Sequence, residues 1–391
     1  MSIFGGAKNK EELALVFDIG SSSVGGALFL MKKTGIPEII YSIREPITLD
    51  NNLNFERFFS LTQKTLEVIT NKICMMGLGA PKKVFCVLSS PWYVSQTRTI
   101  VFKKNTPFIF NSKLADSLIE KEVKLFEEEN SGKETNTNNK VLPIELKNMQ
   151  TMLNGYRVTK PLNQKARELE MTVFISVSEE EVLEKIKEII GRHFYPQNIR
   201  FSSFAIASFA VARDLFIEQD DFLLMDVGGE VTDISMIKKD VLRSSISFSL
   251  GSNFLIRGVA SLLDCSLSEA VSYISLYKDG HMSDSALSKI EPVINKLKKE
   301  WLARFQESLV DLSNDISIPS TIFLTIDQDL AGFFTETIKS EQFNQYTLTE
   351  SKFKVVFLGV EALSDTVLFK NNIIRDSFLA VEAIYINRFI R

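Results

Sequence analysis

Two stretches of the chain follow the same pattern of a short apolar run, a tight turn and a second apolar run. The apolar runs are Leu13–Phe17 and Val24–Leu30 around the first turn, and Asp221–Met225 and Ile234–Ile237 around the second. Runs this short around a turn rich in Gly and Ser predict β-hairpins rather than strand-to-helix phosphate loops. Asp18 and Asp226, the first acidic residues of the two turns, lie 208 positions apart. A repeat at this distance predicts two similar lobes.

The remaining pattern alternates strands with amphipathic helices. We expect further strands at 82–88, 97–102, 156–158, 168–177, 320–324 and 354–358. We expect helices at 111–129, 179–190 and 376–388, helices throughout 254–311, and a polar loop at 130–139. Ser178 with Glu181, and Ser266 with Glu269, have the spacing of a capping box and so predict two helix starts.

This reading gives a domain division. Residues 1–81 and 178–215 are expected to form the first lobe, and 82–177 a small inserted α/β subdomain. Residues 216–391 are expected to form the second lobe, with 254–311 as its helical subdomain and the last helix crossing back.

Composition excludes several classes of protein. The 391 residues carry a net charge of −4, which argues against a dedicated nucleic-acid binder. Three Cys and two His are too few and too scattered for a disulfide scaffold or a zinc site. We find no apolar stretch of membrane-spanning length and no signal-type N-terminus, and we therefore expect a cytoplasmic protein.

The two turns carry side chains suited to a nucleotide–metal complex. Glycine lets backbone amides approach phosphates, serine hydroxyls donate to phosphate oxygens, and a carboxylate at the strand end holds Mg²⁺ through water. The candidate phosphate-binding residues are Asp18, Gly20, Ser21, Ser22 and Ser23 in the first turn, and Asp226, Gly228, Gly229, Thr232 and Asp233 in the second. Asp18 and Asp226 are the candidate metal ligands.

On these residues the chain resembles the actin-like ATPase superfamily, and within it the bacterial FtsA and PilM group. The two turns resemble that family's phosphate loops, and Gly251 lies in a segment similar to the one that follows the second loop. The stretch from Asn154-Gly155-Tyr156 to Pro161, with 166–173, is similar to the subdomain inserted in FtsA. The resemblance implies a two-lobed actin-like, ribonuclease H-like α/β fold with an FtsA-type inserted subdomain, and ATP with Mg²⁺ as the cofactor.

Three of five elements of the nucleotide pocket depart from the family pattern. Ser202 stands where active relatives have the carboxylate or amide that orients the attacking water, and a hydroxyl is a poor base. The adenosine turn best matches Thr325 to Asp327, where Ile326 and Asp327 replace glycines; residues 357–361 are a competing match. Val271 and Ile274 replace the Glu and Lys that flank the adenosine. We therefore expect weak or absent nucleotide binding, ahead of binding with slow hydrolysis.

The resemblance also implies a role. FtsA-like proteins link the division ring to the membrane, and PilM-like proteins form a collar under the type IV pilus machine. The inserted segment favours FtsA, whereas the chain's end at a structural helix favours PilM. We expect a cytoplasmic scaffold that reaches the inner membrane through a membrane-associated partner, with division ahead of pilus assembly, and self-association through the inserted subdomain. A small-molecule kinase of the same superfamily is the alternative from another class.

Overall fold

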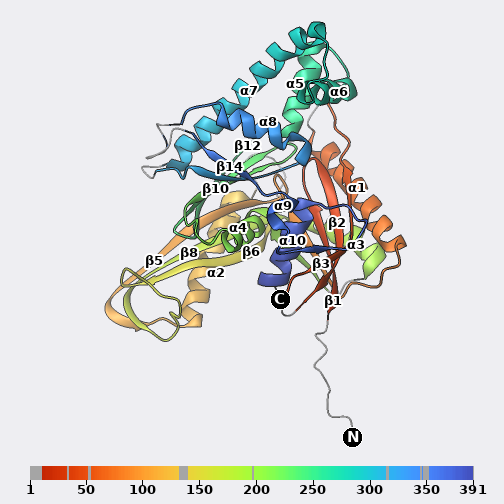
Figure 1. Cartoon of the computed structure of the whole chain (residues 1–391). Helices are drawn as coiled ribbons and strands as arrows, with labels where there is room; N and C mark the ends of the chain where they lie inside the picture. Colours follow the sequence, from red (N-terminus) through yellow and green to blue (C-terminus); the bar gives the residue numbers. More distant parts are fainter. Residues whose placement is uncertain are drawn as a thin grey trace.

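The protein is described by a computed structural model that covers residues 11–32, 35–51, 54–131, 140–195, 198–313, 317–343, 346 and 352–390. Three sheets organise these residues (Figure 1). Two sheets form the two lobes, and a third lies beside them. The α/β class expected from the sequence is confirmed. Most of the polar loop predicted at 130–139 lies outside the described residues.

The six-stranded sheet of the first lobe has the order β15-β3-β2-β1-β4-β9. Its strands are β1 (Glu12–Ile19), β2 (Ser23–Met31), β3 (Glu38–Pro46), β4 (Lys83–Leu88), β9 (Ile199–Ser203) and β15 (Leu368–Phe369). Strand β1 is apolar at successive positions because both of its faces are buried. Leu15 and Phe17 share a core with α1 (Phe55–Met75) and α3 (Glu180–Phe194). Ala14 and Val16 belong to the core on the opposite face.

The five-stranded sheet of the second lobe repeats this arrangement, in the order β12-β11-β10-β13-β14. Its strands are β10 (Phe222–Val227), β11 (Thr232–Lys238), β12 (Val241–Phe248), β13 (Thr321–Ile326) and β14 (Lys354–Phe357). Strand β10 pairs antiparallel with β11 and parallel with β13, as β1 does with β2 and β4. Both predicted hairpins are therefore confirmed.

Two helices lie between the lobes and join their cores. They are α4 (Phe204–Leu215) and α10 (Ser377–Phe389), and they pack against each other. One continuous core contains Val16 of the first sheet, Leu224 of the second, Phe209 of α4 and Ile384 of α10. The lobes are thus connected by buried apolar surface as well as by the chain.

Three helices form a separate unit with its own core above the second sheet (Figure 1). They are α5 (Ser252–Leu263), α6 (Leu267–Lys278) and α7 (Asp284–Ser313). The predicted capping box is present at α6, where Ser266 and Glu269 bond each other's backbone amides. Two more helices, α8 (Gln328–Lys339) and α9 (Val360–Leu363), follow β13 and β14.

The third sheet has the order β5-β8-β6-β7 and is covered by α2 (Ser112–Asn130). Its strands are β5 (Val94–Ile109), β6 (Val141–Leu153), β7 (Tyr156–Arg157) and β8 (Lys165–Glu179). The inserted segment therefore begins after Leu88 and not at residue 82, because β4 pairs with β1 in the first sheet. The second lobe's boundary needs a similar correction, since β15 pairs with β3 of the first sheet.

The capping box predicted at Ser178 is wrong. Strand β8 continues to Glu179, which pairs with Val141 of β6, so α3 begins later than expected. The buried Ser178 hydroxyl donates instead to the carbonyl of Trp92. Long-range strand pairing has overridden a local cap signal here.

A buried carboxylate attaches the inserted sheet to the first lobe. Glu145 of β6 accepts hydrogen bonds from the amide and hydroxyl of Ser203 and, at 2.6 Å, from the hydroxyl of Tyr385 on α10. Burial raises the pKa of Glu145. Because one side chain bonds β9 and α10 together, the inserted sheet is held against both the first sheet and the helix that joins the lobes.

Candidate functional site

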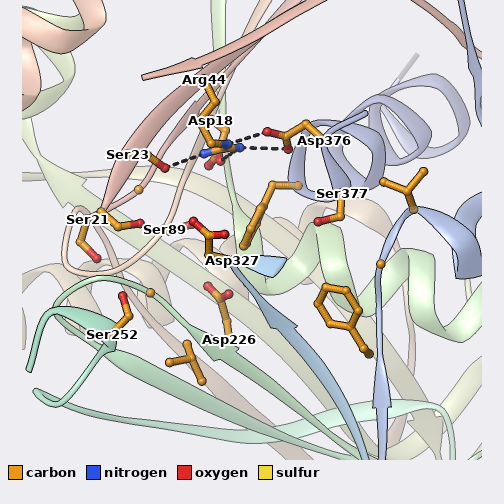
Figure 2. A pocket seen from close by; sticks show the side chains of 18 of the residues that line it. Asp18, Ser21, Ser23, Arg44, Ser89, Asp226, Ser252, Asp327, Asp376 and Ser377 are labelled. Carbon is orange, nitrogen blue, oxygen red and sulfur yellow. Dashed lines mark hydrogen bonds and ion pairs between the residues drawn. The ribbon is translucent and has the colours of Figure 1, made fainter. Parts of the chain in front are cut away.

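A cleft of about 360 Å³ opens between the two hairpin turns and the start of α10 (Figure 2). Eight predicted nucleotide-site residues line it: Asp18, Gly20, Ser21, Ser22, Ser23, Asp226, Gly228 and Asp327. Gly359 of the competing adenosine match lines it as well. The sequence did not single out the further lining residues Arg44, Ser89, Ser252, Arg375, Asp376 and Ser377. The repeat along the chain therefore corresponds to one site between the lobes.

Glycines allow the turns of the two lobes to meet. A Cβ atom at Gly229 would lie 2.6 Å from the amide nitrogen of Ser22 in the opposite turn. A Cβ atom at Gly251 would overlap the carbonyls of Gly228 and Gly229. These glycines therefore contribute to the site by close backbone packing rather than by lining the cleft.

Two hydroxyl residues of the predicted set also act from outside the cleft. Thr232 donates to the carbonyl of Leu250, in the segment that leads to α5. Thr325 donates to the carboxylate of Asp226 at 2.8 Å. Both therefore fix neighbouring groups in place.

Arg44 of β3 connects three sides of the cleft (Figure 2). Its Nη2 donates to Asp18 at 2.6 Å and to Asp376 at 3.1 Å, and its Nε donates to Asp376 at 2.5 Å. Its Nη1 donates to the hydroxyl of Ser23 at 2.9 Å. Burial lowers the pKa of Arg44, but Asp376 and Asp18 outweigh this effect and raise it, so the guanidinium stays charged.

The two aspartates that share Arg44 differ in pKa. Burial raises the pKa of Asp18 more than Arg44 lowers it. Burial also acts on Asp376, but Arg44 and the amides of Phe378 and Leu379 lower its pKa below the usual value. Asp376 is the N-cap of α10, where backbone amides stabilise a negative charge.

Glu382 lies fully buried on α10, one turn and a half beyond this N-cap. Burial and the neighbouring Asp18 raise its pKa well above the usual value, although Arg44 acts in the opposite direction. Ionisation of Glu382 is therefore strongly disfavoured, and its interaction with Asp18 lowers the pKa of that aspartate. A neutral acid in this position lets two carboxyl groups share one buried site.

The residues present do not fit the expected magnesium site. Asp18 is engaged by Arg44, and burial together with Asp233 raises the pKa of Asp226 well above its usual range. No group of three or more His, Cys, Asp or Glu side chains able to hold a metal occurs among the residues the structure describes. Hydroxyls and glycines of the two turns line the cleft, whereas the two carboxylates expected to bind the metal make other contacts.

Asp233, a predicted phosphate-site residue, does not line this cleft. It pairs across strands with Asp226 but lines a neighbouring cleft of about 300 Å³. There its carboxylate accepts hydrogen bonds from the hydroxyls of Ser90, at 3.0 Å, and Ser247. Burial raises the pKa of Asp233, and these two hydroxyls partly offset that effect.

The side expected to hold the adenosine differs from the prediction. Ile274 is buried in the core of α5, α6 and α7, and Val271 is exposed on α6; neither lines the cleft. The cleft instead extends past Asp327 to Gly359, so both candidate adenosine turns reach it. Ser202, at the expected water-orienting position, is buried on β9 outside the cleft.

An ion pair within the second lobe also contacts the first lobe through both of its members. Glu230 receives two hydrogen bonds of 2.7 Å from Arg257 of α5, and its amide donates to Ser21 of the first lobe. Arg257 also donates to the carbonyl of Asp50 in the first lobe at 2.8 Å. Both links hold the second lobe's turn against the first lobe.

One signal in the sequence could have identified Arg44. Gly25 faces Arg44 in the pairing of β2 with β3, and a Cβ atom at Gly25 would lie 2.8 Å from the guanidinium. Paired glycines within an apolar strand indicate that another group approaches closely.

We expect Glu382→Gln to change how stability depends on pH. The folded-state pKa of Glu382 is raised, so the wild-type free energy of unfolding falls as pH rises from about 4.5 toward that pKa. The amide cannot ionise. The free energy of unfolding of the variant should therefore rise relative to that of the wild type by up to about 1.4 kcal/mol per pH unit in this range. Urea unfolding between acidic and alkaline pH measures this, with the exposed Glu300→Gln as control. Parallel curves for wild type and Glu382→Gln would contradict the assignment.

Comparison with known proteins identifies the fold. No family model and no curated protein matches the chain. One chain of the PilM–PilN type IV pilus biogenesis complex is similar in structure over 96% of both chains, with 16% identity and a TM-score of 0.60. Weaker similarities, also over 96% of this chain, include the ethanolamine utilization protein EutJ from Carboxydothermus hydrogenoformans (10% identity, 88% of that chain, TM-score 0.42). Another is MreB 5 of Spiroplasma citri bound to AMPPNP (9% identity, 96% of that chain, TM-score 0.40). The chain therefore has an actin-like ATPase fold of the kind found in PilM.

Proposed function

We propose that this protein is a PilM-type scaffold that assembles at the inner face of the membrane by binding partner proteins, and that its cleft binds a ligand without rapid turnover. The observation that carries the proposal is the engagement of Asp18 by Arg44. An actin-like fold that keeps its phosphate turns but commits its metal-binding carboxylate to an internal ion pair is suited to binding rather than to hydrolysis.

The residue at the expected water-orienting position supports the same conclusion. Ser202 occupies the position at which the family resemblance places the water-orienting group, and it is buried away from the cleft. A serine hydroxyl does not accept a proton efficiently at neutral pH. ATP hydrolysis and phosphate transfer both need a group that activates the acceptor, so both the ATPase and the small-molecule kinase alternatives are disfavoured.

Purified protein with MgATP should release no phosphate above the rate of buffer alone. Sugars, amino acids and acetate, added as acceptors, should not become phosphorylated. Phosphate release and mass spectrometry of the acceptors measure the two reactions. ATP hydrolysis or phosphate transfer by the wild type that is lost in Asp226→Ala would contradict the scaffold proposal and favour an enzymatic function.

We favour pilus assembly over cell division as the host process. A structural similarity with a TM-score above 0.5 is to one chain of the PilM–PilN type IV pilus biogenesis complex. The described residues contain no helix long and apolar enough to cross a membrane, so contact through a partner is consistent with the structure. The stretch of the sequence that resembles FtsA keeps cell division as the second candidate. Tyr156 of this stretch, next to the turn of the β6–β7 hairpin, is 77% exposed and so is accessible to a partner.

Disruption of the gene distinguishes these two processes. We expect loss of surface pili with normal cell length, restored by the wild-type gene supplied in trans. Long undivided cells that keep their pili would exclude the pilus assignment and favour division. In both processes the protein is proposed to reach the membrane through a partner. It should therefore be found in the membrane fraction of cells that contain this partner.

Self-association through the inserted sheet is part of the same proposal. Strand β5 is an edge strand of that sheet, and Val101 on it is 54% exposed. Exposed edge strands favour pairing with another chain, and a lysine on the edge opposes it. Sedimentation velocity should show concentration-dependent oligomers of the wild type and monomers of Val101→Lys. Val271→Lys, at a comparably exposed valine on α6, is the matched control and should behave as wild type.

A further inference from the structure

The hydrogen bonds of Arg44 leave one donor for a ligand. A guanidinium has five N–H groups, and the contacts to Asp18, Asp376 and Ser23 use four of them. The fifth is on Nη1, and Arg44 lines the cleft with its side chain 20% exposed. A guanidinium with one donor left over is therefore present beside the first turn, where Asp18 and Asp376 share its positive charge.

The same contacts remove the carboxylate that a metal ion would need. Asp18 Oδ2 accepts the 2.6 Å bond from Arg44, and Oδ1 is buried beside Glu382. Asp226 is held by Thr325 on the opposite side of the cleft. A divalent ion would have to displace the guanidinium, and this would leave Asp376 as a buried carboxylate without its cation.

We propose that the cleft binds a nucleoside di- or triphosphate without a divalent cation, with Arg44 in the role that Mg²⁺ has in active relatives. The inference rests on the proposed ligand-binding role of the cleft and deepens it. Arg44 faces the phosphates from the side of Ser23, and the serines and Gly228 line the path between the turns.

The far end of the cleft suits the nucleoside. Phe357 and Val360, which lie beside Gly359 in the sequence, line it there, and Arg375 adds a second positive charge. Phe378 instead packs against Arg44, whose guanidinium lies 5.1 Å from the centre of its ring. Apolar and aromatic side chains with a few polar groups are typical of pockets that bind planar ligands. The guanidinium of Arg375 lies over the ring of Phe369, 5.9 Å from its centre, so its contacts differ from those of Arg44.

Calorimetric titration of the full-length protein with ATP and with ADP tests the inference. Each titration is run once in excess EDTA and once in magnesium chloride. We expect the affinity in EDTA to equal or exceed that in magnesium, because Mg²⁺ withdraws the phosphate charge that Arg44 would contact. Binding that requires magnesium overturns the inference but leaves the scaffold role standing. No binding in either buffer also overturns it, and the gene-disruption phenotype still decides the scaffold role independently.

Variants then assign the effect to Arg44. Arg44→Gln should lower affinity in EDTA by about tenfold or more, as expected for loss of a charged hydrogen bond. It should also make binding dependent on magnesium, because Asp18 is released to hold the ion. Arg375→Gln, in the same cleft, should weaken binding without creating metal dependence. If Arg44→Gln does not fold, Ser23→Ala tests the same contact, since it removes the hydroxyl that orients Nη1. Equal metal independence in a folded Arg44→Gln would contradict the role of Arg44.

Discussion

The arrangement around the cleft depends on the charge of one buried guanidinium. Arg44 comes from β3 of the first sheet, Asp18 from the end of β1, and Asp376 from the N-cap of α10. Without this charge, Asp18 and Asp376 would be buried beside Glu382 with no cation, and ionisation of both aspartates would be disfavoured. One side chain therefore determines the protonation of the carboxyls and the position of the helix that joins the two lobes.

Local features of the sequence were sufficient to predict the parts of the fold that short-range patterns determine. Both hairpins, the capping box at Ser266 and the terminal helix were confirmed, because each is specified by neighbouring residues. The errors arose where distant segments meet. Strand β4 joins β1, and Ser178 is used by Trp92 rather than by the helix that follows it. Neither contact leaves a mark within a short window of sequence.

In the candidate site, too, the features set by neighbouring residues could be predicted and those set by distant residues could not. The turn residues were recognisable because the same pattern of Asp, Gly and small hydroxyl residues follows an apolar run twice along the chain. Arg44 was not, because a single arginine in a half-buried strand is usually solvated, and its partners lie 26 and 332 positions away. The separation of Asp233 from Asp226 also escaped prediction. The two residues are directly paired on neighbouring strands. The carboxylate of Asp233 lies in the second cleft, where it accepts hydrogen bonds from Ser90 and Ser247.

Helix α10 connects the cleft to the inserted sheet through side-chain hydrogen bonds. Its first turn bonds Arg44, its middle carries Glu382 beside Asp18, and Tyr385 bonds Glu145 of the inserted sheet. A ligand that competes for Arg44 would weaken the hold on Asp376, and any movement of α10 would reach the inserted sheet through Glu145. On the other side of the turns, Arg257 and Glu230 hold the lobes together without contacting α10. The helix is thus the element through which occupancy of the cleft can alter the surface that we propose for assembly, while the second link keeps the lobes closed.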